Sequence, residues 1–135
     1  MVGRAVLDTS VIIEVFERKN TRLLSELTRR YDELYTAWVC LYEYLFGFKY
    51  LGRDIAEEKS LVEEALLVAY PDQRTLEEAL ELDVELSKRG QKIPFSDVLI
   101  AAQARQLEAT VVTLDEKHFS RLRSIGVEAE LLKSG

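Results

Sequence analysis

Short apolar runs alternate with longer amphipathic stretches along the chain, and this alternation predicts strands separated by helices. The expected strands cover residues 4–8, 34–38, 66–70, 110–114 and 127–131. Strands that are separated by helices pair in parallel and are joined by right-handed crossovers. We therefore predict an α/β fold, a three-layer α/β/α sandwich with a mainly parallel sheet, in one domain over residues 1–135.

The helices are expected where apolar residues recur at helical spacing. Asp54 and Ser96 are suited to cap the helices that follow them, and Gly90 is suited to end the helix before it. The expected helices cover residues 11–18, 21–30, 39–51, 54–64, 73–89, 97–107 and 116–122. The helix at 39–51 is apolar nearly all round, so one face can pack on the sheet while the other needs a second chain. The alternative is a helix that is sandwiched entirely within the core.

The composition is that of an ordinary globular protein, with 135 residues of which 47% are hydrophobic and 31% are charged. A chain of this length can fold without disulfides or a structural metal. Cys40 is the only cysteine, which excludes an intrachain disulfide and a zinc site built on thiolates. The first residues show no signal-peptide pattern and no apolar run is long enough to span a membrane, so we expect a cytoplasmic protein.

The net charge of −6 disfavours a passive nucleic-acid binder, because such proteins usually carry a basic excess. It leaves open an enzyme that acts on nucleic acid through metal ions, since bound cations reverse the local field. The sequence has no phosphate-binding P-loop and no dinucleotide-binding fingerprint.

Four acids differ from the others because each is alone in an uncharged stretch. Most acids lie among other charges on helix faces, as Glu77 and Glu78 do. The four exceptions are Asp8 between residues 5 and 13, Glu43 in 34–48, Asp97 between 93 and 104, and Asp115 at the end of 109–114. A lone carboxylate in such a stretch is drawn toward the interior, where an unpaired charge costs several kcal/mol. Since no Lys or Arg lies in the same stretches, we expect the four to meet and share bound cations.

The expected topology supports this meeting. Asp8 and Asp115 follow strands, and ligands bind at the carboxyl ends of strands in open α/β sheets. Asp97 opens a helix, where the macrodipole favours an anion, and Glu43 can project over the same edge. The hydroxyls of Thr9, Ser10, Ser96 and Thr113 lie beside these acids and could orient them.

Each acid also has a purely structural interpretation. Asp8 could form an Asx turn, Asp97 could be a dipole partner of its helix, and Asp115 could be an N-cap. Glu43 has no such explanation, because an acid in the middle of an aromatic helix caps nothing. The combination of all four therefore favours a functional site.

Four segments that contain these acids resemble the motifs of PIN domains, particularly VapC-type toxins. The segments are Val-Leu-Asp8-Thr-Ser, Glu43-Tyr-Leu-Phe-Gly47, Phe-Ser-Asp97-Val-Leu-Ile-Ala-Ala-Gln-Ala and Val-Val-Thr113-Leu-Asp115-Glu-Lys-His-Phe. By this resemblance, Asp8, Glu43, Asp97 and Asp115 are the catalytic, metal-binding acids, and Thr9, Ser10 and Thr113 assist them.

The resemblance implies a Mg²⁺- or Mn²⁺-dependent endoribonuclease that hydrolyses RNA by a two-metal mechanism. It also implies neutralisation by a VapB-like antitoxin and a homodimer. Six basic residues are candidates for gripping RNA phosphates: Lys49, Arg53, Lys88, Arg89, Lys92 and Lys117.

Three other interpretations are open. A receiver-like signalling domain would use Mg²⁺ and Asp72, which follows an expected strand, but it would also need paired acids after its first strand. A nuclease-fold subunit that has lost activity would serve only in assembly. A haloacid-dehalogenase-type phosphatase is disfavoured, because no second Asp follows Asp8 two positions on. The only histidine, His118, is surrounded by charged residues and is expected to be a surface group, so a histidine-pair ribonuclease mechanism is excluded.

Overall fold

Five short strands form one sheet in which every pairing is parallel. The structure is a computed structural model, and it describes residues 3–133. The strands are β1 (Arg4–Leu7), β2 (Glu33–Ala37), β3 (Leu67–Ala69), β4 (Ala109–Thr113) and β5 (Ala129–Leu131). Their order in the sheet is β3-β2-β1-β4-β5, so β1 and β4 lie at its centre. The mainly parallel sheet expected from the sequence is confirmed.

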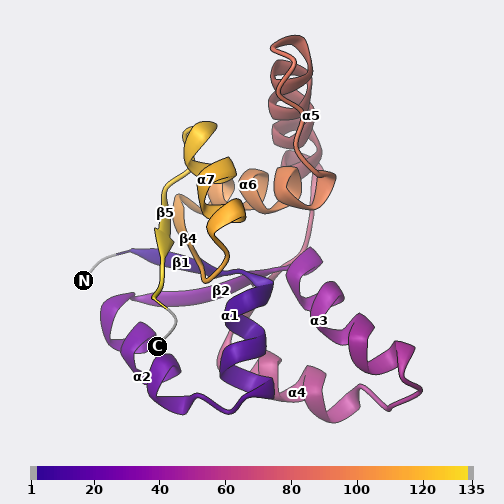
Figure 1. The fold of residues 1–135 in the computed structure, drawn as a ribbon, viewed down its shortest axis with the longest axis vertical. Helices are drawn as coiled ribbons and strands as arrows, with labels where there is room; N and C mark the ends of the chain where they lie inside the picture. The colour runs from indigo at the N-terminus through magenta and orange to yellow at the C-terminus, as the bar shows by residue number, and fades with distance from the viewer. Residues whose placement is uncertain (1–2, 134–135) are drawn as a thin grey trace.

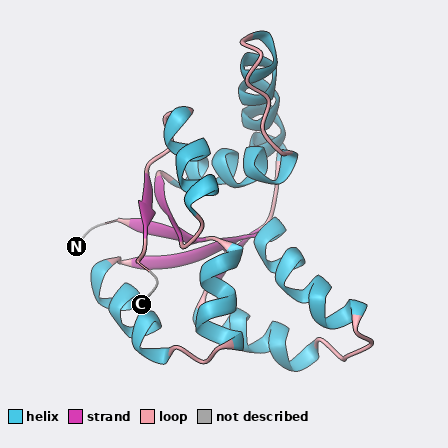
Figure 2. Ribbon diagram, in the orientation of Figure 1, coloured by secondary structure: helices cyan, strands magenta, loops and turns pink. Residues whose placement is uncertain are grey.

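Helices connect the strands and cover both faces of the sheet (Figures 1 and 2). The helical segments are α1 (Thr9–Ile12), the π-helical turn η1 (Ile13–Glu17), α2 (Thr21–Arg30), α3 (Trp38–Tyr50), α4 (Ala56–Ala65), α5 (Gln73–Lys88), α6 (Phe95–Leu107) and α7 (Glu116–Ser124). In Figure 1, α1, α2 and α4 lie on one side of the sheet and α6 and α7 on the other, while α5 packs on α6 and extends away from the sheet. The three-layer α/β/α architecture predicted from the sequence is thereby confirmed.

The strand order places a switch point between β1 and β4. From β1 the chain continues toward β2 and β3 on one side, and from β4 it continues toward β5 on the other. Crossovers between parallel strands are right-handed as a rule, so helices on the two sides of a switch point cover opposite faces of the sheet, and ligands bind in the crevice at the carboxyl ends of such strands. Asp8 directly follows β1, so the first of the lone acids lies at this crevice.

The core lies between the sheet and the helix layers. Ala5, Val6 and Leu7 of β1 are fully buried, as are Val111 and Val112 of β4 beside them. A central strand that is covered on both faces has no solvent side, which explains its uninterrupted apolar sequence. No helix among residues 3–133 is long and apolar enough to cross a membrane.

Some element ends differ from the prediction. The first helix begins at Thr9 rather than residue 11, because the Asp8 carboxylate accepts from the Thr9 backbone N–H and acts as its N-cap. Ser96 does not cap the helix after it; α6 begins two residues earlier than expected, at Phe95, with Pro94 in the N-cap position. Gly90 has φ +67° directly after the end of α5, as expected for a helix stop.

The sheet order also separates the fold from the receiver alternative, whose strands follow the order 2-1-3-4-5. Here β2 lies between β1 and β3. Asp72 has a structural role in this fold, since its carboxylate accepts from the Thr75 backbone N–H in a capping box that begins α5. The receiver interpretation is therefore wrong.

Candidate active site

The lone acids are brought to the carboxyl edge of the sheet by four different elements. Asp8 follows β1, and Asp115 lies two residues beyond the neighbouring strand β4. Asp97 lies in the first turn of α6, and Glu43 in the second turn of α3. A helix that connects two parallel strands runs antiparallel to both of them. Its first turn therefore lies near the carboxyl ends of the strands, which is this same edge of the sheet. The edge therefore collects acids from the beginning, middle and end of the chain.

Asp8 is nearly completely buried, with 1% of its surface exposed, and hydroxyl groups surround it. Its Oδ2 accepts from Thr113 Oγ1 at 2.7 Å and from Ser10 Oγ at 3.3 Å, while Oδ1 accepts from the Thr9 N–H at 2.8 Å. Burial by itself would raise the pKa of Asp8. The hydrogen bonds from His118 and Thr113 outweigh this effect and lower the pKa below the ordinary 3.8.

The positive charge that faces these acids comes from α7. Nδ1 of His118 is 3.0 Å from Asp8 Oδ2, and its Nε2 is 3.7 Å from Asp97 Oδ1. Nη1 of Arg121 donates to Asp97 Oδ2 at 3.1 Å. The hydrogen bond to Asp8 raises the pKa of His118 to about 9, with further contributions from the charges of Asp97 and Asp115. His118 is therefore protonated at neutral pH and lies between two buried carboxylates.

The expectation that His118 is a surface group is wrong. Its side chain is 28% exposed and one edge of its ring is held against Asp8. The sequence neighbours of His118 are charged, but the helix turns its ring away from them and toward the sheet edge. Sequence reasoning also missed Arg121, although a signal was present. His118 and Arg121 follow Asp115 at intervals of three residues, which places them on the same side of the helix that Asp115 begins.

Glu43 and Asp115 lie at a more open part of the same site. The Thr9 hydroxyl donates to Glu43 Oε1 at 2.8 Å. The Asp115 Oδ1 accepts from the backbone N–H groups of Lys117 and His118, so Asp115 is also the N-cap of α7. Both acids line a cavity of about 440 Å³, together with Thr9, Ser10, Ile13, Tyr42, Phe46 and His118. The acids at this cavity and the two buried aspartates are thus linked through Thr9 and His118.

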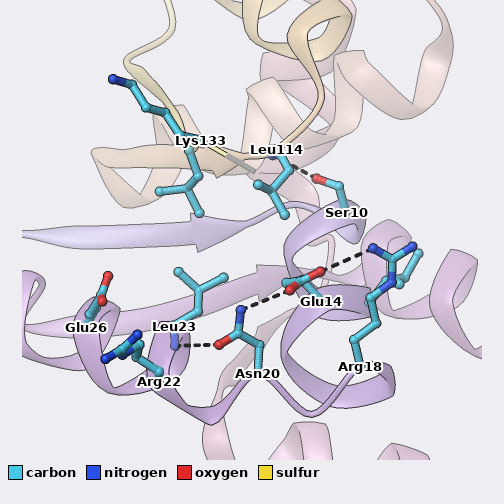
Figure 3. Close-up of a pocket in the computed structure, with 11 residues that line it drawn as sticks. Ser10, Glu14, Arg18, Asn20, Arg22, Leu23, Glu26, Leu114 and Lys133 are labelled. Carbon is cyan, nitrogen blue, oxygen red and sulfur yellow. Dashed lines mark hydrogen bonds and ion pairs between the residues drawn. The ribbon is translucent and has the colours of Figure 1, made fainter. Parts of the chain in front are cut away.

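A larger cavity of about 540 Å³ begins on the other side of Ser10 (Figure 3). Ser10 and Ile13 line both cavities, and the Ser10 hydroxyl accepts from the Leu114 N–H at 3.0 Å. Three cationic residues line the larger cavity, Arg18, Arg22 and Lys133, alongside Glu14 and Glu26. The six basic residues expected from the sequence to contact phosphates line neither of these two cavities.

The ligand chemistry of the site fits a hard divalent cation. Asp8, Glu43, Asp97 and Asp115 offer only carboxylate oxygens, which Mg²⁺ and Mn²⁺ prefer. The position of the His118 ring shows that the fold accommodates a positive group between Asp8 and Asp97. Among residues 3–133, however, no three His, Cys, Asp or Glu side chains already converge on one point. Asp8 and Asp97 have His118 and Arg121 as their positive partners in this structure, whereas Glu43 and Asp115 line the neighbouring cavity.

The chain is similar to known proteins over most of its length. Residues 5–125 match the family model described as the PIN domain. The chain is 25% identical to Ribonuclease VapC2 of Haemophilus influenzae over 126 residues, which are 91% of this chain and 95% of that protein. It is 28% identical to Ribonuclease VapC1 of Methanocaldococcus jannaschii over 131 residues, covering 93% and 86% of the two proteins.

Solved structures share the fold. VapBC2 from Rickettsia felis, bound to a DNA fragment from its promoter, matches with a TM-score of 0.77 at 21% identity over 98% of this chain and 100% of that chain. VapBC-1 from nontypeable Haemophilus influenzae matches with a TM-score of 0.72 at 24% identity over 97% and 98%.

Proposed function

Because the chain belongs to the PIN-domain family, we propose that it is a metal-dependent endoribonuclease and the toxin of a VapBC-type toxin–antitoxin pair. One observation carries the proposal. Asp8 and Asp97, from two distant parts of the chain, are each 1% exposed and both contact the ring of His118. Bringing two carboxylates together in the interior is costly, and the capping of α1 by Asp8 does not require a second buried acid beside it, so the pair indicates a functional site. The distant relatives named VapC ribonucleases support the same activity.

Asp8, Glu43, Asp97 and Asp115 are the residues that would hold Mg²⁺ or Mn²⁺. Divalent ions held there would activate water for attack and would offset the charge that develops on the phosphate, in the two-metal manner. The ion pairs of Asp8 with His118 and of Asp97 with Arg121 show that this buried site has negative charge that a cation can balance.

The hydroxyl residues have the role of fixing these acids. Thr113 and Ser10 hold one oxygen of Asp8, and Thr9 holds Glu43. Such hydrogen bonds restrict the rotation of a carboxylate and keep its free lone pairs directed at one place. Protonated His118 lines the open cavity, where its charge attracts the phosphodiester anion of the substrate.

The proposed partners follow from the same relatives. Several of the matching structures are VapBC complexes, so we infer a VapB-like antitoxin for this chain as well. A homodimer remains part of the proposal. The alternative of an inactive assembly subunit has no specific support, since all four acids are present at the sheet edge.

The proposal is tested by incubating the purified protein with 5′-labelled RNA, with Mn²⁺ or with EDTA. We expect cleavage with Mn²⁺, none with EDTA, and a loss of at least 100-fold for Asp97→Asn, which keeps the size of the side chain but removes a ligand charge. Asp72→Asn is the matched control, because it makes the same change at a helix cap away from the site. Equal cleavage by wild type and Asp97→Asn would contradict the assignment, and so would a loss confined to Asp72→Asn.

A further inference from the structure

The two carboxylate oxygens of Asp8 face different surroundings. Oδ1 accepts from the backbone N–H of Thr9 at 2.8 Å and lies 3.9 Å from Sγ of Cys40, whose side chain is completely buried. This oxygen therefore faces the interior of the protein. Oδ2 contacts the partly exposed ring of His118, so it is the oxygen that faces the candidate site.

Three donors already surround Oδ2 of Asp8. They are Thr113 Oγ1 at 2.7 Å, Nδ1 of His118 at 3.0 Å and Ser10 Oγ at 3.3 Å. A carboxylate oxygen has about two lone pairs, so these donors leave Oδ2 no position for a metal ion. Asp8 can therefore bind an ion through Oδ2 only when one of the three donors leaves.

Two of these donors are held in place by other contacts. Thr113 is fully buried in the central strand β4, and its hydroxyl also accepts from the Asp115 N–H at 3.0 Å. The Ser10 hydroxyl accepts from the Leu114 N–H at 3.0 Å. If either hydroxyl moved away, a backbone N–H at the sheet edge would lose its acceptor, which is costly where water is excluded. These two donors therefore stay on Asp8.

His118, by contrast, has room to move. Its side chain is 28% exposed and lines the cavity of about 440 Å³ that also contains Glu43 and Asp115. Rotation about the side-chain bonds to another staggered rotamer carries the ring into this space. The backbone N–H of His118 donates to Asp115 Oδ1 at 3.2 Å, and this bond holds the start of α7 in place while the ring turns.

The ring also stands between Asp8 and Asp97. Its Nε2 is 3.7 Å from Oδ1 of Asp97, whereas Oδ2 of Asp97 accepts from Arg121 at 3.1 Å. Mg²⁺ requires its ligands at about 2.1 Å in a nearly octahedral arrangement. Among residues 3–133, no three potential ligands converge in this way. Asp8 and Asp97 can share an ion only after the ring that contacts both of them has moved.

We propose that His118 is a displaceable positioning residue, whose ring occupies the site-facing oxygen of Asp8 in the metal-free protein and turns into the neighbouring cavity when a divalent ion binds. This inference rests on the metal site of the proposed function, and it adds to that site a residue that holds it ready without being a ligand. Arg121 differs in this respect, because it contacts only one oxygen of Asp97 and leaves the other for an ion.

The displacement has a measurable consequence for metal affinity. A protein that must break an existing contact before it can bind has a lower apparent affinity than one whose competent arrangement is already populated. Removal of the His118 ring should therefore strengthen metal binding. A purely structural role of His118 predicts the opposite, because loss of a supporting contact would disorder the acids and weaken binding.

The first test is a titration of the full chain with Mn²⁺, without RNA, followed by the electron paramagnetic resonance signal of the free ion. We expect His118→Ala to bind Mn²⁺ about 10-fold more tightly than wild type, since it lacks the charge-assisted hydrogen bond that binding otherwise breaks. Lys117→Ala is the matched control, because it removes one positive charge at the adjacent, exposed position. Its affinity should change by less than about 2-fold, since exposed charges are screened by salt.

The second test observes the ring in the wild-type protein and so does not depend on how a variant folds. His118 is the only histidine, so a ¹⁵N-labelled chain without a histidine tag gives one set of imidazole NMR signals. In EDTA we expect an Nδ1–H proton that is protected from exchange by its bond to Asp8. Saturation with diamagnetic Mg²⁺ should abolish this protection, because the ring then faces the cavity.

Several outcomes would overturn the inference. They are a folded His118→Ala that binds Mn²⁺ no more tightly than wild type, a Lys117→Ala that gains as much affinity as His118→Ala, and an Nδ1–H that stays protected at saturating Mg²⁺. If these occur while wild type binds Mn²⁺ and cleaves RNA, only the role of His118 fails. If neither wild type nor His118→Ala binds Mn²⁺, the proposed metal site fails as well. If His118→Ala binds more tightly but no RNA is cleaved, the ribonuclease function fails and the role of His118 stands.

Discussion

Nδ1 of His118 lies 3.0 Å from Oδ2 of Asp8, so the only histidine of the chain is the direct partner of one of its two buried lone acids. The two residues are 110 positions apart. Each changes the pKa of the other, lowering that of Asp8 and raising that of His118 to about 9. This pair makes the stability of the metal-free protein depend on pH in a defined direction.

We predict that the metal-free protein loses stability as the pH rises from 6.5 to about 9. The pKa of His118 is raised from its ordinary 6.5 to about 9 in the folded state, so its contribution is complete below 6.5 and disappears as the proton leaves at higher pH. The loss should be about 2 kcal/mol, allowing for partial solvent screening. Urea unfolding in EDTA at several pH values measures it, and His118→Gln should abolish the dependence. An imidazole that titrates near 6.5 by NMR would contradict the pairing.

The opposite dependence is expected of Asp8 in acid. Its pKa lies below the ordinary 3.8, so its stabilising contribution is present above that pH and disappears as the pH falls further. We expect Asp8→Asn to unfold with a smaller loss of stability between pH 4 and pH 2 than wild type shows. Thermal unfolding followed by circular dichroism provides the measurement, and parallel acid curves for the two proteins would refute the shift.

Arg121→Ala should destabilise the protein by about 1–3 kcal/mol, because it leaves the buried Asp97 with only a distant partner in His118. Arg123→Ala is the matched control on the same helix, since Arg123 is exposed and contacts only the ring of Phe119 in a cation–π arrangement among the described interactions. Denaturant unfolding at pH 7 compares the two variants. Similar losses in both would show that the pair of Arg121 and Asp97 contributes nothing.

Thr113→Val should cost about 1–3 kcal/mol and should also weaken Mn²⁺ binding, measured by calorimetry. The substitution keeps the shape of the side chain but removes the hydroxyl that donates to Asp8 at 2.7 Å and accepts from the Asp115 N–H at 3.0 Å. Thr110→Val on the same strand is the control, because its hydroxyl makes no hydrogen bond within residues 3–133. Unchanged Mn²⁺ affinity in Thr113→Val would rule out a positioning role for this hydroxyl.

The sequence by itself determined the secondary structure and the class of fold. Each expected strand and helix occurs, since local periodicity and the helix stop at Gly90 act within a few residues of the chain, although Ile55 and not the expected Asp54 is the N-cap of α4. The lone acids were also recognisable, because the cost of an unpaired charge in an apolar stretch is a local property. Ser96 failed as a cap because Pro94, with its fixed φ, takes the N-cap position two residues earlier.

Only the tertiary structure decided which charges balance these acids and which face of α3 stays in solvent. His118 and Arg121 meet Asp8 and Asp97 across 110 and 24 positions of chain, and no periodicity encodes such contacts. Likewise, the aromatic residues of α3 look alike in sequence, yet Tyr44 and Phe48 are buried while Phe46 is exposed. Packing against the sheet makes that distinction, because burial depends on the whole fold whereas the sequence pattern depends on near neighbours alone.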